Sequence, residues 1–189
     1  MNTEKERKTD RRTLYTQMVI KEAMLSLLAK KEYGQITITD LCREAEISRG
    51  TFYLHYDNPA QVVDALFDDV LGDTHSVFKQ IGCETAKDEA CGYPLCRFLR
   101  ENKKYQPLFF ADSLFSLAVD RIVEHGFDHF SQTLENACSI EPETLRDLSY
   151  FQLSGCLSVC KHNRNLSDDE WVQVQCSIDH LLKNGFQGL

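Results

Sequence analysis

Residues 48–56 read Ser-Arg-Gly-Thr-Phe-Tyr-Leu-His-Tyr, and residues 37–47 before them read Thr-Ile-Thr-Asp-Leu-Cys-Arg-Glu-Ala-Glu-Ile. In the earlier run, Leu41 and Ala45 are four residues apart, which places both on one face of a short helix. Ser48 is a good N-cap for a second helix, because its hydroxyl can accept a hydrogen bond from an unpaired backbone N–H. The two runs therefore predict helix, tight turn and helix, a shape that can set its second helix in the major groove of DNA.

The apolar residues around this motif predict a small core. A helix over about residues 12–31 carries an apolar stripe with the spacing i, i+3, i+4, i+7 and i+8. Leu54 is also expected to pack within the protein rather than to contact a partner. The stripe consists of Ile20, Ala23, Met24, Leu27 and Leu28, and we expect it to face Ile36, Ile38, Leu41, Ala45, Ile47, Phe52 and Tyr56.

The chain after this motif also reads as helical. Asn58 and Pro59 suit the N-cap and the first position of a long helix, where the missing N–H of proline costs nothing. Pro107 is expected to break a helix that begins near residue 94, because its ring clashes with the preceding turn. Later helices are predicted over about residues 59–80, 94–105, 113–137, 142–162 and 168–184, with a short piece at 108–111.

Two of the later helices carry their own start signals. Pro142 suits the first position of one helix, and Ser167 with Glu170 forms a capping box before the last. No run of residues gives a convincing strand, so the predicted fold class is all-α with about nine helices. We expect two domains, at residues 1–58 and 59–189.

The helix-turn-helix segment resembles the DNA-binding domain of the TetR family of bacterial transcriptional regulators. The resemblance is carried by residues 38–41, 45–56 and 58–59, within a stretch that runs from about residue 14 to residue 71. It implies an all-helical homodimer with an N-terminal three-helix DNA-binding domain. It also implies a C-terminal domain that dimerises and usually binds a small molecule.

Seven residues are predicted to meet double-stranded DNA. Arg49 can grip the edge of a guanine with two hydrogen bonds, and Gly50 lets the backbone approach the groove closely. The resemblance implies DNA contacts for the positions held by Thr39, Thr51, Tyr53 and His55. The alternative for Arg49, Tyr53 and His55 is a solvated surface position. The predicted set is Thr39, Ser48, Arg49, Gly50, Thr51, Tyr53 and His55.

The charge of the chain is unevenly distributed. The net charge is −8, but residues 1–60 carry a balance of +1 and the rest a balance of −9. A basic arm at the start suits phosphate contacts, although it also reads as a frayed terminus. Many family members have Lys where this chain has Pro59, so we expect modest affinity and a shallow salt dependence. The arm contains Lys5, Arg7, Lys8, Arg11 and Arg12.

The second predicted domain is rich in aromatic and small residues. The aromatic side chains can line an apolar effector pocket, although most of them suit the core of a helical bundle. Residues 97–105 resemble a subgroup of the family that is common in Firmicutes. The predicted effector-binding residues are Phe98, Tyr105, Phe109, Phe110 and Phe115. On the family's pattern the predicted dimer interface is Leu153, Cys156, Leu157, Cys160, Ile178, Leu181 and Leu182, an isologous contact.

The sequence gives little support to other classes of protein. The eight cysteines lack zinc-site spacing, which favours structural cysteines over redox or metal sensing. No phosphate-binding loop, nucleophile elbow or metalloprotease motif is present, so we expect no catalytic residue, metal or cofactor. The start lacks a secretory signal and no stretch suits a membrane span, which predicts a cytoplasmic protein with mostly reduced cysteines.

These patterns together predict a ligand-responsive transcriptional regulator, with repression as the expected role. A homodimer would place two recognition helices on a pseudo-palindromic operator and respond to a small-molecule effector. The alternative is a TetR-shaped protein-binding adaptor or co-activator with weakened DNA contacts. The acidic total and Pro59 favour that alternative.

Overall fold

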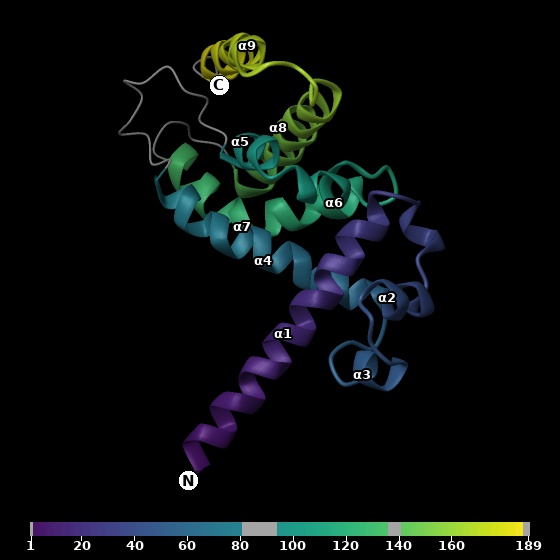
Figure 1. The fold of residues 1–189 in the computed structure, drawn as a ribbon. Coiled ribbons are helices and arrows are strands. Elements are labelled where there is room, and N and C mark those ends of the chain that lie inside the picture. The colour runs from purple at the N-terminus through teal and green to yellow at the C-terminus, as the bar shows by residue number, and fades with distance from the viewer. Residues whose placement is uncertain (1, 81–93, 136–140, 187–189) are drawn as a thin grey trace. The chain divides into compact units, whose positions relative to one another are not determined.

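The computed structural model describes residues 2–80, 94–135 and 141–186, and Figure 1 shows that these residues are mostly helical. The described ranges contain no strand, so the predicted all-α class is confirmed. The nine α-helices of these ranges are α1 (Asn2–Leu28), α2 (Ile38–Glu44), α3 (Arg49–Tyr53), α4 (Pro59–Gln80), α5 (Pro94–Glu101), α6 (Gln106–Phe110), α7 (Phe115–Glu135), α8 (Pro142–His162) and α9 (Asp168–Phe186).

Backbone contacts divide the chain into two compact units. Unit 1 comprises Met1–Asp69 and Lys104–Phe115, and unit 2 comprises Val70–Lys103 and Ser116–Leu189. Unit 1 therefore contains the first half of α4 and all of α6 besides the segment that we predicted as the DNA-binding domain. The predicted boundary at residues 58–59 stays a prediction.

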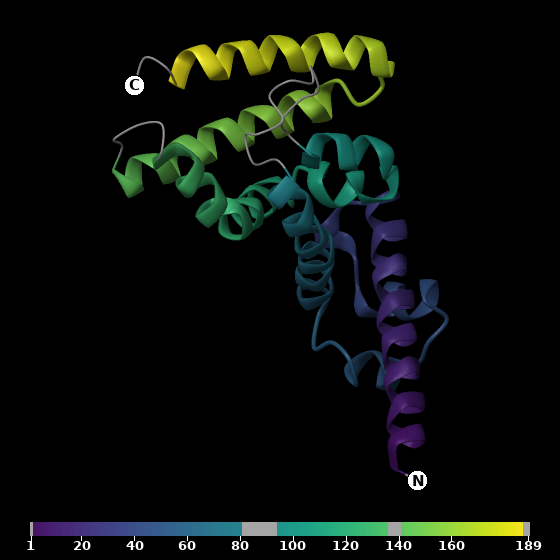
Figure 2. The same ribbon diagram turned by 90° about the vertical axis from the view of Figure 1, so that its left-hand side faces the viewer.

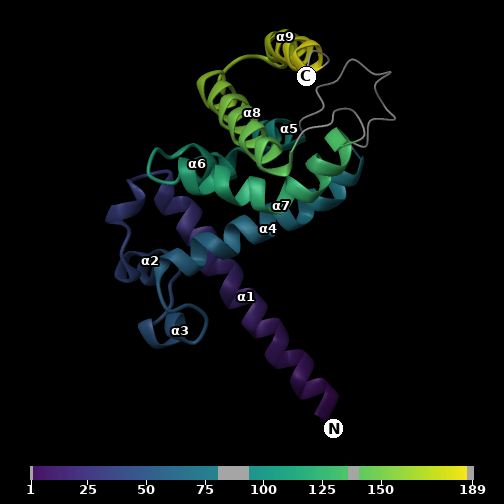
Figure 3. The ribbon, with the colours of Figure 1, turned by 180° about the vertical axis from the view of Figure 1, so that it is seen from behind.

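The core of unit 1 forms where α1 packs against α2 and α6. All five residues of the predicted stripe on α1 are buried, and so are Leu41 and Phe52 of the helix-turn-helix. Phe67 on α4 meets Phe109 on α6 edge to face, with ring centroids 5.3 Å apart. Full burial of each such side chain contributes about 1.5–3 kcal/mol. Figure 3 shows α2 and α3 next to each other in this unit.

Two helix boundaries differ from the prediction. Helix α1 begins at Asn2 rather than near residue 12, so the backbone of the basic arm is helical. Helix α5 ends at Glu101, and Pro107 does not break it. Pro107 instead lies in the first turn of α6, where an N–H would have no partner within the helix. The predicted helix ending near residue 105 was therefore wrong.

In unit 2, α5 packs against α8. Leu99 of α5 is buried, and so are Leu145 and Leu157 of α8. Figure 2 shows that α9 runs back in the opposite direction to α8. The connection between the two helices ends in the predicted capping box, in which Ser167 N–H donates to Glu170 at 2.9 Å. Helix α9 continues past the predicted stop at residue 184 to Phe186. No described helix is both long and apolar enough to span a bilayer.

Candidate nucleic-acid interface

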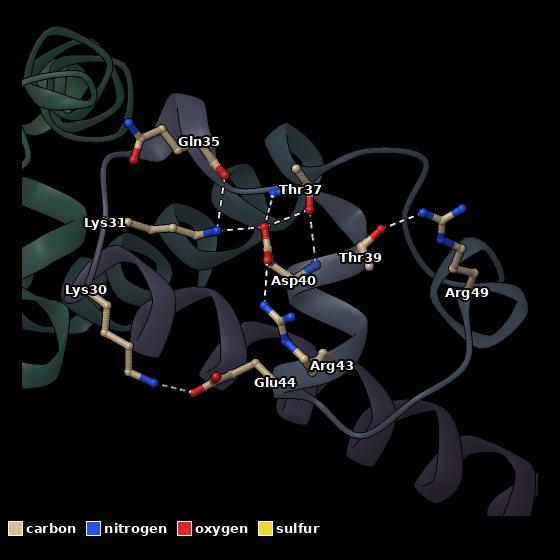
Figure 4. A network of polar contacts seen from close by, with 9 residues as sticks. All are labelled: Lys30, Lys31, Gln35, Thr37, Thr39, Asp40, Arg43, Glu44 and Arg49. Carbon is tan, nitrogen blue, oxygen red and sulfur yellow. Dashed lines mark hydrogen bonds and ion pairs between the residues drawn. The ribbon is translucent and has the colours of Figure 1, made fainter.

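Helix α2 begins at a capping box that the surrounding charges reinforce. The Thr37 hydroxyl accepts a hydrogen bond from Asp40 N–H at 3.1 Å, and the Asp40 carboxylate accepts one from Thr37 N–H at 3.0 Å. Lys31 and Arg43 also donate to this carboxylate, at 2.6 and 2.8 Å, as Figure 4 shows. Hydrogen bonds from Lys31 and Thr37 hold the pKa of Asp40 well below its usual range.

The turn between α2 and α3 is a Schellman motif. Ile47 N–H donates to the Cys42 carbonyl at 2.9 Å, and Glu46 N–H donates to the Arg43 carbonyl at 3.3 Å. Glu46 lies between them with a φ of 53°, a left-handed conformation that is usually taken by glycine. Ile47, one of the apolar residues expected in the core, follows and is half-buried. This geometry fixes the direction in which α3 leaves α2.

Helix α3 is short, and local contacts define both of its ends. The Ser48 hydroxyl accepts a hydrogen bond from Thr51 N–H at 3.0 Å, which confirms the predicted N-cap. Phe52 is fully buried and anchors the helix, with the Tyr56 ring tilted against it at 6.1 Å. Burial and the nearby Asp69 raise the pKa of Tyr56 to about 12. The opposite side of α3 is left exposed.

Arg49 and Thr39, two of the predicted DNA-contacting residues, touch each other on that exposed side. The Arg49 guanidinium donates a hydrogen bond to the Thr39 hydroxyl, which joins the start of α3 to the first turn of α2 (Figure 4). Gly50 follows, and a Cβ placed there would meet only the Ser48 hydroxyl, at 3.7 Å. The packing of unit 1 therefore does not require glycine at this position.

The other predicted DNA-contacting residues lie along the same short helix and its end. Tyr53 is exposed, whereas Thr51 and His55 are half-buried. Leu54 is 80% exposed, so the prediction that it packs within the protein was wrong. The reason is that α3 ends at Tyr53, after which helical spacing no longer tells which side chains face the core. Sequence reasoning thus missed Leu54 as a surface residue next to α3.

The predicted effector-binding residues are divided between the two units. Phe98 is half-buried in unit 2, whereas the other four belong to the part of unit 1 formed by residues 104–115. Phe109 and Phe110 are buried there, and Lys104 Nζ lies 4.9 Å from the centre of the Tyr105 ring. The contact between Phe109 and Phe67 places this side chain in the core of unit 1.

The predicted dimer residues also differ in exposure. Leu157 and Cys160 are buried within the single chain, which makes them unsuitable as contact surface for a second copy. Leu181 is 71% exposed on α9. Leu153, Cys156 and Ile178 are half-buried, and Leu182 lies outside the described side chains. Among the described residues, no three His, Cys, Asp or Glu side chains converge as metal ligands would.

Comparison with known proteins adds to this geometry. No family model matches the chain. It is 41% identical over 64 residues to the HTH-type transcriptional regulator YxbF of Bacillus subtilis, a match that covers 33% of this chain and 17% of YxbF. It is 24% identical over 161 residues to DhaS of Lactococcus lactis, the HTH-type transcriptional activator of the dhaKLM operon, covering 81% of this chain and 75% of DhaS. The likeness to both relatives supports a DNA-binding transcriptional regulator of the helix-turn-helix type.

Proposed function

We propose that this protein is a TetR-like transcriptional regulator that binds an operator through α2 and α3. The observation that carries the proposal is the exposed pair of Arg49 and Thr39, which presents a guanidinium at the start of α3. The Schellman turn and the anchor at Phe52 hold this helix against α2. A guanidinium fixed in this way is suited to the two acceptors on the major-groove edge of guanine.

Contacts to phosphate are expected to be few around α4. The Asn58 side chain accepts the N–H of Gln61 at 3.1 Å, and Pro59 occupies the position where many family members have lysine. The Gln61 side chain in turn bonds to Asp57 at 2.9 Å, so an acidic group lies beside this helix start. Each phosphate contact steepens the dependence of affinity on salt, so we expect a shallow slope for this protein.

The proposed homodimer would form through exposed apolar side chains of unit 2. Phe151 on α8 and Val172 and Leu181 on α9 are all large, apolar and exposed in the single chain. Exposed apolar residues of this kind mark association surfaces when they are grouped. A second copy would cover them in an isologous contact, in which the same residues of both copies meet.

An effector site in unit 2 is part of the proposal. The indole N–H of Trp171 is buried and lacks a hydrogen-bond partner among the described residues. A small molecule with a hydrogen-bond acceptor would satisfy it, because a buried donor without a partner costs about 1–3 kcal/mol. A switch that fully reverses the populations of two states needs about 5.5 kcal/mol of differential binding.

The direct test measures, by fluorescence anisotropy, how tightly the full chain binds the DNA upstream of its own gene. Arg49→Ala should weaken specific binding by about 1–3 kcal/mol while the protein stays folded. The matched control is Arg97→Ala. Arg97 is an exposed arginine of unit 2 that forms an ion pair with Glu101. Thr39→Val should show a smaller loss in the same direction, because it removes the acceptor that positions Arg49. Equal affinity of the wild type and Arg49→Ala would contradict the assigned role.

The direction of regulation has two candidates. Repression is our expectation from the sequence, whereas DhaS, which the chain matches over most of its length, is a transcriptional activator. A promoter–reporter fusion in a strain with and without the gene separates them. Higher reporter output without the gene supports repression, and lower output supports activation. An unchanged output together with no DNA binding would favour the adaptor.

A further inference from the structure

Leu54 is the most exposed of the large apolar side chains in the described part of the chain, with 80% of its surface accessible. Its backbone is nevertheless fixed, because Leu54 N–H donates to the Gly50 carbonyl at 3.3 Å and completes the last turn of α3. The next two N–H groups, of His55 and Tyr56, both donate to the Phe52 carbonyl, at 2.9 and 3.0 Å. The apolar side chain therefore stands on an ordered backbone, so a partner that covers it orders little additional chain.

Leu54 lies on the side of α3 that faces away from the core. Phe52 is fully buried, and a helix turns through about 200° in the two residues from Phe52 to Leu54. Gly50 is one turn before Leu54 and lies on the same side. A Cβ at Gly50 would meet only the Ser48 hydroxyl, at 3.7 Å, so this side of α3 has open space one turn before Leu54. The leucine side chain therefore stays accessible to a partner that lies along α3.

The neighbouring side of α3 carries Arg49 and Tyr53, two of the predicted DNA-contacting residues. They are four residues apart and therefore lie one above the other on the helix. The Arg49 guanidinium is held by the Thr39 hydroxyl (Figure 4). The Tyr53 ring meets the Phe52 ring edge to face, with ring centroids 5.8 Å apart. Leu54 thus extends a surface whose other side chains are already held in position.

The chemistry of leucine limits what Leu54 can recognise in a major groove. Its side chain has neither a hydrogen-bond donor nor an acceptor. The major-groove edges of guanine, cytosine and adenine carry donors and acceptors, whereas thymine adds a C5 methyl group. A leucine against a polar edge would remove water without replacing its hydrogen bond, but against a methyl group it buries apolar surface. Thymine is therefore the base that suits Leu54.

A protein partner suits this surface less well. Contact sites between proteins centre on a group of apolar or aromatic side chains that become fully buried. The residue beside Leu54 on its own side of α3 is Gly50, and the neighbouring side begins with the charged Arg49. A glycine at this place instead allows the backbone of α3 to approach base edges closely.

We propose that Leu54 recognises a thymine in each half of the operator by covering its C5 methyl group. The inference rests on the proposed operator binding and adds a second base to the guanine assigned to Arg49. Arg49 and Leu54 are five positions apart, which corresponds to about 7.5 Å along a helix. Base pairs are spaced by about 3.4 Å, so the thymine lies within about three base pairs of the guanine.

The test compares thymine with deoxyuridine, whose base lacks only the C5 methyl group. The full-length wild type first selects an operator from random duplex DNA, and each thymine near the guanine is then replaced in both halves. Deoxyuridine pairs with adenine as thymidine does and keeps the same acceptor in the major groove. At one position, fluorescence anisotropy should show wild-type affinity falling about fourfold per half-site, the factor for one buried methyl group. Leu54→Ala should bind both duplexes with equal affinity.

Two further variants separate a thymine contact from a general effect on folding. Leu14→Ala shortens another exposed leucine of unit 1 and should keep the wild-type ratio of affinities for the two duplexes. Leu54→Met keeps an apolar side chain of similar volume, so it should keep most of that ratio. Because the ratio is measured within one variant, a partial loss of folded protein affects both duplexes equally and cancels.

Failure of this inference can be distinguished from failure of operator binding. A wild type that binds every uracil duplex as tightly as the selected operator would overturn the role of Leu54, and so would an unchanged ratio in Leu54→Ala. If the guanine preference still depended on Arg49, operator binding would stand and a protein partner would better explain the exposed leucine. If the wild type selected no operator, both proposals would be overturned.

Discussion

At the scale of single residues, a substitution at Gly50 tests the stability of the fold and the proposed DNA contact separately. A Cβ at this position meets only the Ser48 hydroxyl at 3.7 Å, so the chain itself has room for alanine. Gly50→Ala should raise the free energy of unfolding by roughly 0.5 kcal/mol, because alanine is the better helix former. Operator binding should weaken, because the added methyl group keeps the backbone away from the groove.

The two readouts for Gly50→Ala are urea unfolding and fluorescence anisotropy with operator DNA. A stable variant with unchanged affinity would show that the backbone of α3 does not approach DNA closely. Thr51→Ser is a useful companion, since it keeps the hydroxyl and the N–H that contact Ser48. It should leave the cap in place and change stability little.

The backbone of Glu46 is strained. Its φ of 53° lies in the left-handed region, which costs an L-residue with a side chain about 1–2 kcal/mol. Glu46→Gly should remove this cost and raise the free energy of unfolding by about 0.5–1 kcal/mol, after the loss of chain entropy by glycine is counted. Glu46→Ala is the control, because it removes the carboxylate but keeps the Cβ. Thermal unfolding in which both variants behave alike would contradict this account.

At the scale of elements, the start of α2 makes stability depend on pH. Hydrogen bonds from Lys31 and Thr37 lower the folded-state pKa of Asp40, so its ionised form stabilises the protein above the unfolded pKa of about 4. That contribution is lost as the pH falls from about 5 toward the lower folded pKa. The pKa values of Glu44 and Glu170 are lowered as well, by Lys30 and by Ser167, so they add to the same acid sensitivity.

Asp40→Asn should therefore reduce the free energy of unfolding at pH 7. It should also make that free energy depend less on pH in the acid range. The measurement is urea unfolding at several pH values between about 2 and 7 for both proteins. Asn retains an acceptor oxygen, so the loss at pH 7 reports mainly the missing charge. Parallel curves for the wild type and Asp40→Asn would show that this carboxylate does not link folding to pH.

The sequence predicts these elements best where their signals are local. The N-caps at Ser48 and Asn58 and the capping box at Ser167 need only neighbours within four residues, and the structure has all three. The boundary between α5 and α6 was predicted wrongly, because proline both ends helices and begins them. Leu54 was misplaced because α3 ends one residue before it.

Contacts between distant segments were not predictable from spacing. Phe67 meets Phe109 across 42 positions of sequence, and nothing in either neighbourhood indicates the other. The predicted DNA-contacting residues lie close together in the sequence, since all but one of them belong to residues 48–55, and their role stays a prediction.

At the scale of the whole molecule, the proposed homodimer needs the exposed apolar residues of α8 and α9. Leu181→Glu should dissociate it, because a charge would then be buried at the contact. Leu14→Glu is the matched control, since Leu14 is another exposed leucine. The exposed fraction is 57% for Leu14 and 71% for Leu181. Light scattering coupled to size-exclusion chromatography measures the mass. A wild type with the mass of one chain, or a Leu181→Glu variant with the mass of two, would contradict the proposed interface.

The central claim is that α3 reads DNA sequence, and selection from random duplex DNA tests it most directly. Full-length wild type and Arg49→Ala would each select from the same library, and the bound sites would be sequenced. We predict an inverted repeat with half-site centres about one helical turn, 34–36 Å, apart, and a guanine preference in each half that Arg49→Ala loses. No enriched sequence for the wild type, or the same enriched repeat for Arg49→Ala, would contradict it.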